Sequence, residues 1–251
     1  MERISTGVYG LDELIEGGYF KGSSILITGK TGTGKTLFSA SFVYSGALSG
    51  EKAVYITTEE TEEDFINDVQ STFKDWYFKE QVENGLIKVI SIKPVLIETS
   101  EVEMSRFLKM YIHSLLENVK AHASEGEIKR VVIDSVSMIE LFLKDPYTAR
   151  VGLSLLIDEL KRLEVTSILT GTIEEGSEKL SGSGIIEFLV DGVIKLDFVP
   201  VTEEFQRTLV IRKMRRTNHS TLVHPFQITS SGIRVLKPEE ISEDMFKDLK
   251  I

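Results

Sequence analysis

The chain has 251 residues, of which 41% are hydrophobic, so one large domain or two small ones can bury a core. The formal net charge of −10 argues against general nucleic-acid binding, because phosphates favour surfaces rich in lysine and arginine. The lack of cysteine excludes disulfides and thiolate metal sites. No apolar leader or long apolar run occurs, so we expect a cytoplasmic protein that does not enter a membrane.

Short apolar runs alternate with amphipathic stretches over most of the chain. We predict buried strands at 24–28, 53–58, 86–92, 130–134 and 165–171, and helices at 101–122 and 147–163. This alternation predicts a mostly parallel central sheet flanked by helices on both faces. From about residue 192 only strand patterns follow, which predicts an antiparallel C-terminal β-meander at one sheet edge. We expect a single domain over 1–236 and a charged tail over 237–251.

The segment GKTGTGKT, residues 29–36, matches the phosphate-binding loop pattern GxxxxGK[ST]. It follows an apolar strand and precedes a helical stretch, which is the context that this loop requires. Glycines let backbone N–H groups converge on phosphates, and the following helix N-terminus favours anions. We therefore predict that Lys35 contacts the β- and γ-phosphates and that the Thr36 hydroxyl binds Mg²⁺. The alternative is a glycine-rich turn that matches by chance.

Acidic residues follow two of the predicted strands. Asp134 ends the run RVVID and can hold a water on Mg²⁺, although a helix cap or a solvated strand end would give the same pattern. Glu59 and Glu60 follow the run AVYITT and can orient and deprotonate an attacking water. The alternative for this pair is ordinary acids in a first helical turn, with Thr61 and Asp64 as a capping pair.

The basic segment, residues 213–219 (KMRRTNH), lies at the end of a late strand. Lys213 and Arg215 alternate with Met214, so the two cations are expected on one face. Such cations can neutralise a transferring phosphoryl group held by a neighbouring subunit. The alternative is a solvated basic edge strand that discourages aggregation.

Four motifs in order make the pattern specific. The stretch STGVYGLDELIEGG followed by the P-loop resembles the opening of KaiC-like ATPases of the RecA superfamily. The segments YITTEET, VVIDSVS and KMRRTNHSTLVHPFQIT resemble the double-glutamate segment, the Walker B strand and the C-terminal hairpin of that family. The resemblance runs from about residue 4 to 236 and implies a RecA-like P-loop NTPase fold of the single-domain, archaeal type.

The resemblance also implies roles for individual residues. Glu59 would be the general base beside Glu60, and Asp134 would join Thr36 at Mg²⁺. The basic segment would act in trans on ATP held by the adjacent subunit. Ser71 falls where the family approaches the adenine. The implied nucleotide contacts are Thr31, Gly32, Thr33, Gly34, Lys35, Thr36, Leu37, Ser71, Lys213, Met214, Arg215, Thr217 and His219.

The sequence departs from the family at three places. Arg216 stands where the family usually has glycine, which can alter the approach of the basic segment. Glu187 and Phe188 occupy the place of the Ser/Thr pair that clock members phosphorylate, so autokinase activity is not expected. The stretch 174–184 matches a loop that faces the ring channel, but its scarcity of basic residues weakens the idea that DNA threads the ring. A mobile solvated loop is the favoured interpretation there.

We carry three hypotheses forward from the sequence. The first is a Mg²⁺-dependent ATPase acting as a homo-oligomer, expected to be a hexamer, that regulates a protein partner whose identity the sequence does not reveal. The second is an accessory protein in DNA recombination that binds single-stranded DNA weakly, as some archaeal members are classed as recombinase (RadA) paralogues. Candidate DNA contacts are Arg207, Arg212, Lys213, Arg215 and Arg216. The third is an ATP-dependent scaffold with negligible turnover.

Overall fold

The computed structural model describes residues 2–93, 101–124, 128–137, 139, 146–174, 176–177, 179–182, 184–201 and 204–236. Its main feature is a nine-stranded sheet with the order β11-β10-β9-β8-β3-β7-β6-β4-β5. The strands are β3 (Ser24–Gly29), β4 (Lys52–Thr57), β5 (Ile87–Ser91), β6 (Ile128–Asp134), β7 (Thr166–Thr172), β8 (Gly192–Val201), β9 (Glu204–Met214), β10 (Val223–Thr229) and β11 (Gly232–Val235). A separate small sheet pairs β1 (Arg3–Ile4) with β2 (Tyr19–Phe20).

The strands from β5 to β8 along this order are mutually parallel, and β8 to β11 are joined as antiparallel neighbours. The helices are α1 (Leu11–Leu14), α2 (Lys35–Leu48), α3 (Glu62–Thr72), α4 (Phe78–Glu83), α5 (Glu101–Ser124), α7 (Pro146–Arg162) and α8 (Ile186–Leu189). Within the described residues, no helix is both long enough and apolar enough to cross a membrane.

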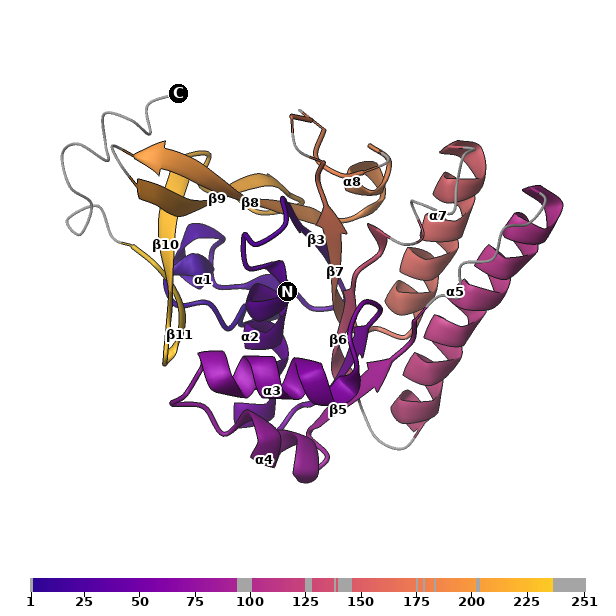
Figure 1. Ribbon diagram of the computed structural model, residues 1–251, viewed down its shortest axis with the longest axis horizontal. Helices are drawn as coiled ribbons and strands as arrows, with labels where there is room; N and C mark the ends of the chain where they lie inside the picture. Colours follow the sequence, from indigo (N-terminus) through magenta and orange to yellow (C-terminus); the bar gives the residue numbers. More distant parts are fainter. Residues whose placement is uncertain are drawn as a thin grey trace.

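Helices cover both faces of the sheet. Figure 1 shows α5 and α7 side by side on one face, while α2, α3 and α4 lie on the other. On α5, the buried residues Leu108, Ile112, Leu115 and Val119 recur at helical spacing and pack in one of two hydrophobic clusters. Every residue of β3 is buried, as expected for a central parallel strand that is covered on both sides.

The predicted architecture is confirmed, and each predicted strand and helix lies within a few residues of its expected bounds. The C-terminal meander is also confirmed, with β8 joining it to the parallel strands through β3. The small β1–β2 sheet and the short helices α1, α4 and α8 were not predicted. The charged tail at 237–251, and residues 175, 178 and 183 of the predicted channel loop, lie outside the described residues.

The N-terminal segment fixes the position of α2, the helix that begins at the P-loop. Gly7 has a φ of 77°, and a Cβ at this position would collide with the backbone carbonyl of Ser41 in α2. The buried Arg130 of β6 donates to the carbonyls of Ser5 and Phe42, both at 2.8 Å. The N-terminal segment, α2 and β6 are thus connected through one guanidinium, which holds the middle of α2 against the sheet.

The only tryptophan of the chain, Trp76, packs between three separate parts of the fold. Its ring stacks on Tyr44 of α2 with a centroid distance of 4.1 Å, and it contacts Phe73 at 4.0 Å. The indole N–H donates to the carbonyl of Ser231 in the β10–β11 turn at 2.9 Å. This contact joins the C-terminal hairpin to the helical layer that surrounds α2.

Candidate functional site

The P-loop connects β3 to α2 and lines a cavity of about 320 Å³. The cavity lies where the carboxyl ends of the parallel strands meet, which is the usual position of a ligand site in an open α/β sheet. Residues from the loop, from the start of α2 and from the ends of β4, β6 and β7 contribute to its wall. They are Thr31, Gly32, Gly34, Lys35, Thr36, Leu37, Glu59, Asp134, Ser135 and Thr172.

The P-loop keeps its shape through left-handed glycines and internal hydrogen bonds. Gly32 and Gly34 have φ values of 80° and 103°, a region that side chains disfavour. The predicted contact Thr33 is buried beneath the loop, where its hydroxyl donates to the Lys30 carbonyl at 2.8 Å. Lys35 Nζ donates to the carbonyls of Gly29 and Lys30, each at 2.9 Å. Burial lowers the pKa of Lys35, and the nearby carboxylates of Asp134 and Glu59 oppose this effect.

Asp134 lies at the end of β6 and faces the P-loop cavity. Its carboxylate accepts a hydrogen bond from Tyr55 Oη at 2.7 Å and another from the Thr170 hydroxyl. The residue is only 9% exposed, so the alternative of a solvated strand end is wrong. The two hydroxyl groups orient the carboxylate, and the pKa of the buried Tyr55 is raised well above its ordinary value by burial and by Asp134.

Glu59 and Glu60 lie before α3 and differ in their surroundings. The Glu59 carboxylate lines the cavity and accepts a hydrogen bond from the Ser135 hydroxyl at 2.9 Å. Glu60 is half-buried outside the lining, and burial together with nearby carboxylates, first among them Asp134, raises its pKa to about 7. The predicted capping pair is confirmed, because Thr61 Oγ1 accepts from the Asp64 backbone N–H at 3.2 Å. Both glutamates therefore precede the helix and do not belong to its first turn.

The raised pKa of Glu60 predicts a pH-dependent stability effect in the nucleotide-free protein. In the folded state Glu60 keeps its proton above the pH at which an unfolded chain would release it. It therefore destabilises the fold as the pH rises from about 4.5 to about 7. Glu60→Gln should raise Tm by about 2–4 °C at pH 8, after allowance for solvent screening, and by much less at pH 4.5. The exposed Glu63→Gln on α3 is the control, and equal shifts of Tm at both pH values would contradict the assignment.

The basic segment lies near the opposite end of the strands from the P-loop. Lys213 pairs with Val193 of β8, which pairs with Leu26, three residues before Gly29 on β3. Lys213 Nζ donates to the carbonyls of Glu187 at 3.0 Å and Val190 at 2.6 Å.

Lys213 and Arg215 both lie beside residues 187–191, which precede β8, whereas Arg216 lies over the Phe20 ring. Arg215 is about half-exposed and lies 3.4 Å from Asp191, which also pairs with Lys161 at 2.9 Å. As a whole, β9 lies between β8 and β10, but the alternative of an edge strand stays open for residues 213–214, which are not among those paired with β10. β10 pairs only with residues 208–210 of β9. Neither Lys213 nor Arg215 lines the P-loop cavity of its own chain.

The remaining predicted nucleotide contacts are dispersed. Met214 is buried in the core, where it packs beside Gly192. Thr217 and His219 are half-buried near the basic segment, and the His219 ring lies 2.9 Å from the Ser220 carbonyl. Ser71 is exposed near the end of α3 and donates to the Asp68 carbonyl at 3.1 Å. None of these side chains lines the P-loop cavity.

Sequence reasoning missed the polar side chains that support the acidic residues. Tyr55 and Thr170 are buried strand residues, and nothing in the local pattern distinguishes them from core positions. Ser135 directly follows Asp134 within the segment VVIDSVS, which is the one local signal that could have indicated it. Thr172 ends β7, where its backbone N–H donates to the Ser137 hydroxyl at 2.8 Å.

The donor chemistry of the cavity fits Mg²⁺ bound together with phosphates. Thr36 and Asp134 offer a hydroxyl and a carboxylate on the same wall. Among the described residues, no group of three or more His, Cys, Asp or Glu could hold a metal by itself. Mg²⁺ typically binds through one or two protein oxygens together with substrate phosphates and water, and this donor set is consistent with that mode.

Comparison with known proteins agrees with this geometry. The family model described as "ATPase: KaiC" matches residues 4–240. A UPF0273 protein of Methanopyrus kandleri is 36% identical over 248 residues, covering 96% of this chain and 94% of its own. The circadian clock oscillator protein KaiC of Synechococcus elongatus is 32% identical over 234 residues, covering 93% of this chain and 44% of its own.

A solved structure shares the fold as well as the sequence. The crystal structure of a KaiC-like protein from Pyrococcus horikoshii superposes with a TM-score of 0.79 at 36% identity, covering 94% of this chain and 99% of that one. The family match, the relatives and this structure all indicate the same family and fold. The chain therefore belongs to the KaiC family of RecA-like ATPases.

Proposed function

We propose that this protein binds ATP in the P-loop cavity and hydrolyses it with Mg²⁺, as a homo-oligomer whose sites are completed by adjacent subunits. The main support is the convergence of Lys35, Thr36, Glu59 and Asp134 on one cavity of about 320 Å³. These residues come from the P-loop, α2 and the ends of two parallel strands, and they supply a cation, a hydroxyl and two carboxylates. Phosphoryl transfer needs this combination of phosphate binding, metal binding and water activation.

The triphosphate would be bound by the P-loop N–H groups and by Lys35. The Lys35 ammonium already lies against the loop, where it donates to the carbonyls of Gly29 and Lys30, each at 2.9 Å. Mg²⁺, held by Thr36 and through water by Asp134, would neutralise charge on the phosphate oxygens. Tyr55 and Thr170 would keep the Asp134 carboxylate in one orientation, so that little reorganisation accompanies binding.

Glu59 would act as the general base. The water oxygen attacks the γ-phosphorus, its proton passes to the Glu59 carboxylate, and the bond to the β–γ bridging oxygen breaks to release ADP and phosphate. The Ser135 hydroxyl, at 2.9 Å, would hold this carboxylate towards the cavity. Glu60, whose pKa is about 7, would influence Glu59 through its charge. The carboxylate at the cavity wall is the better candidate for proton abstraction because a base must reach the water.

The basic segment would complete the site of a neighbouring subunit. Lys213 lies two strands across the sheet from Gly29 and three residue positions, roughly 10 Å, further along the strands, and its ammonium is directed to the carbonyls of Glu187 and Val190. Because the segment is remote from its own cavity, we infer that its cations act in trans. Met214 would then contribute its backbone rather than its buried side chain.

Charge complementarity supports head-to-tail association. The acidic residues Glu59 and Asp134 line the P-loop cavity, whereas Lys161, Lys213 and Arg215 gather around the basic segment. Opposite charges on the two faces favour contact between copies of the chain. We expect a hexameric ring in which ATP turnover changes subunit contacts, and a regulatory role through a protein partner. The regulatory part rests on the relative that is named a circadian clock oscillator protein.

Separate glutamine variants test the assignment of the base. Glu59→Gln should keep ATP binding but lower the rate of phosphate release by roughly 10²-fold or more, because an amide cannot accept the proton from water. Glu60→Gln is the matched control and should retain more activity. Steady-state phosphate release and ATP calorimetry on both proteins provide the measurements.

The outcome separates three possibilities. Normal hydrolysis by the Glu59→Gln protein together with loss in the Glu60→Gln protein would exchange the two roles. Normal hydrolysis by both variants would locate the base elsewhere. A wild-type protein that binds ATP with Mg²⁺ but releases no phosphate above background would leave an ATP-dependent scaffold in place of the ATPase.

A further inference from the structure

The turn of the basic segment contains a residue in an unfavourable backbone conformation. Arg216 has a φ of 59°, in the left-handed region that residues with a Cβ rarely adopt. Glycine adopts this conformation freely because it has no Cβ. An arginine in this position needs surrounding contacts that hold it.

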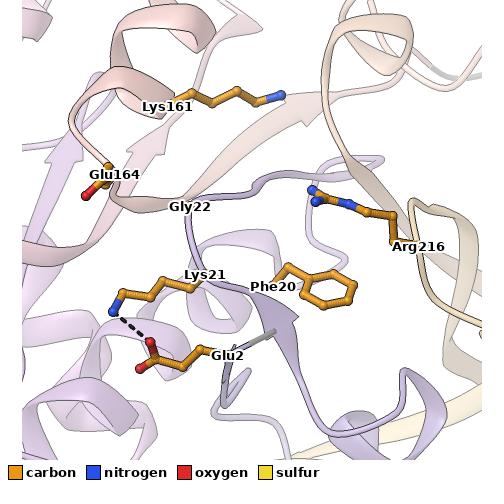
Figure 2. A pocket seen from close by; sticks show the side chains of 7 residues that line it. All are labelled: Glu2, Phe20, Lys21, Gly22, Lys161, Glu164 and Arg216. Atoms are coloured by element: carbon orange, nitrogen blue, oxygen red, sulfur yellow. Dashed lines mark hydrogen bonds and ion pairs between the residues drawn. The ribbon is translucent and has the colours of Figure 1, made fainter.

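The contacts of the Arg216 side chain lead to the N-terminal β1–β2 sheet. The Arg216 guanidinium carbon lies 5.2 Å from the centroid of the Phe20 ring, and that of Arg3 lies 4.1 Å from the same centroid. Both distances are within the range of cation–π attraction. Figure 2 shows Arg216 extending from the turn towards the Phe20 ring, at the side of a pocket of about 500 Å³.

Arg3 fixes the other side of this contact. Its Nη1 donates to the carbonyls of Ile15 at 2.8 Å and Gly18 at 2.7 Å, and its side chain is only 17% exposed. Its Nη2 also donates to Thr217 Oγ1 at 3.4 Å. The ring and the turn are therefore both tied to one guanidinium, which is itself anchored on the α1–β2 connection.

The turn is thus held from two directions. On one side, Lys213 bonds to the carbonyls of Glu187 and Val190, and the Arg215 backbone N–H donates to the Asp191 carbonyl at 2.9 Å. On the other side, Arg216 and Thr217 contact Phe20 and Arg3 of the β1–β2 sheet. A cation that must meet a phosphoryl group on another subunit needs a fixed position.

We propose that Phe20 and Arg216, braced by Arg3, are positioning residues that set the geometry of Lys213 and Arg215 for reaction in the adjacent site. This inference rests on the proposed function. The contact of the Arg216 guanidinium with Phe20 supports the left-handed backbone of this residue and holds the turn in place. The β1–β2 sheet would thereby support catalysis by fixing the basic segment, without contacting the nucleotide itself.

We call the contacts of the Phe20 ring with Arg216 and Arg3 the clamp. Substitutions that keep or remove these contacts test the proposal. Phe20→Leu removes the ring from a half-buried position but keeps an apolar side chain, and Arg216→Gly permits the left-handed turn but removes the guanidinium. Each should lower kcat by roughly 10- to 100-fold, with KM for ATP changed by less than about 2-fold, because a small displacement of a catalytic group affects turnover more than binding. Phe20→Tyr should restore most of kcat. Lys21→Gln in the same pocket is the control and should match wild type.

Oligomer size by light scattering and Tm are measured on every variant. Wild-type kcat in correctly assembled Phe20→Leu and Arg216→Gly proteins would overturn the clamp, provided that the Lys213→Ala/Arg215→Ala protein is inactive. If that double variant is also fully active, the in-trans function itself fails. An equal loss of kcat and Tm in Phe20→Tyr and Phe20→Leu would show simple packing and would likewise overturn the clamp.

Discussion

The Lys35→Ala protein will lose ATP binding, and this is the largest single-residue effect that we expect. The ammonium lies within the P-loop and meets the carboxylates of Asp134 and Glu59 across the cavity. Its removal deprives the β- and γ-phosphates of their nearest cation. The negative charges of Asp134 and Glu59 then repel the phosphates without an opposing positive charge. Loss of a partly buried charge of this kind costs about 2–5 kcal/mol, so affinity should fall by roughly 30- to 5000-fold.

Calorimetry with ATP and Mg²⁺ gives the affinity directly. Lys30→Ala is a matched control, because that lysine belongs to the same loop but does not line the cavity. It should retain binding close to that of wild type. A Tm near the wild-type value would show that the Lys35→Ala protein is folded. Wild-type affinity in a folded Lys35→Ala protein would contradict the phosphate-binding assignment.

The second large effect concerns the subunit interface. Lys213→Ala/Arg215→Ala should bind ATP almost normally but hydrolyse it far more slowly, because a cation offered in trans stabilises the transition state more than bound ATP. Removal of such a cation costs a factor of about 10³ or more in other phosphoryl-transfer systems.

Mixed oligomers distinguish action in trans from action within one chain. Lys213→Ala/Arg215→Ala subunits keep an intact P-loop, and Lys35→Ala subunits keep an intact basic segment. Each protein alone should be inactive, whereas mixtures contain interfaces that join the two intact parts and should regain part of the activity. Mixtures of Lys35→Ala with Glu59→Gln subunits are the control, since both defects affect the same cavity and should not complement each other.

Two results would contradict the shared site. The first is a mixture that stays inactive although mixed oligomers are detected by mass spectrometry. The second is a Lys213→Ala/Arg215→Ala protein that hydrolyses ATP at the wild-type rate on its own. In either case the basic segment would be left with a structural role in the C-terminal part of the sheet.

Much of the fold could be predicted because its main strands and helices carry strong local patterns. Fully apolar runs such as that of β3 and the helical spacing of Leu108, Ile112 and Leu115 identify their elements without tertiary information. The β1–β2 sheet escaped prediction because two-residue strands carry no periodicity, and their pairing depends on a contact such as that of Arg3 with Phe20.

Some residues of the candidate site could be predicted from local sequence patterns, and others could not. The P-loop and Asp134 could be predicted because parallel strands bring their carboxyl ends together. The positions of Tyr55, Thr170 and Phe20 depend on contacts between distant segments, so the local sequence could not reveal them. The alternation of Lys213 and Arg215 with Met214 was informative, since Met214 is buried in the core. Binding of single-stranded DNA stays a prediction, as does the hexamer.

The surroundings of Trp76 make the protein suitable for optical study. As the sole tryptophan, it provides one intrinsic fluorophore, and its position between Tyr44 and Phe73 excludes solvent from the indole. Its emission therefore reports from a single point where α2, the α3–α4 connection and the β10–β11 turn meet. Because α2 begins at the P-loop, the same signal monitors, without any added label, the integrity of the structure that presents the nucleotide site.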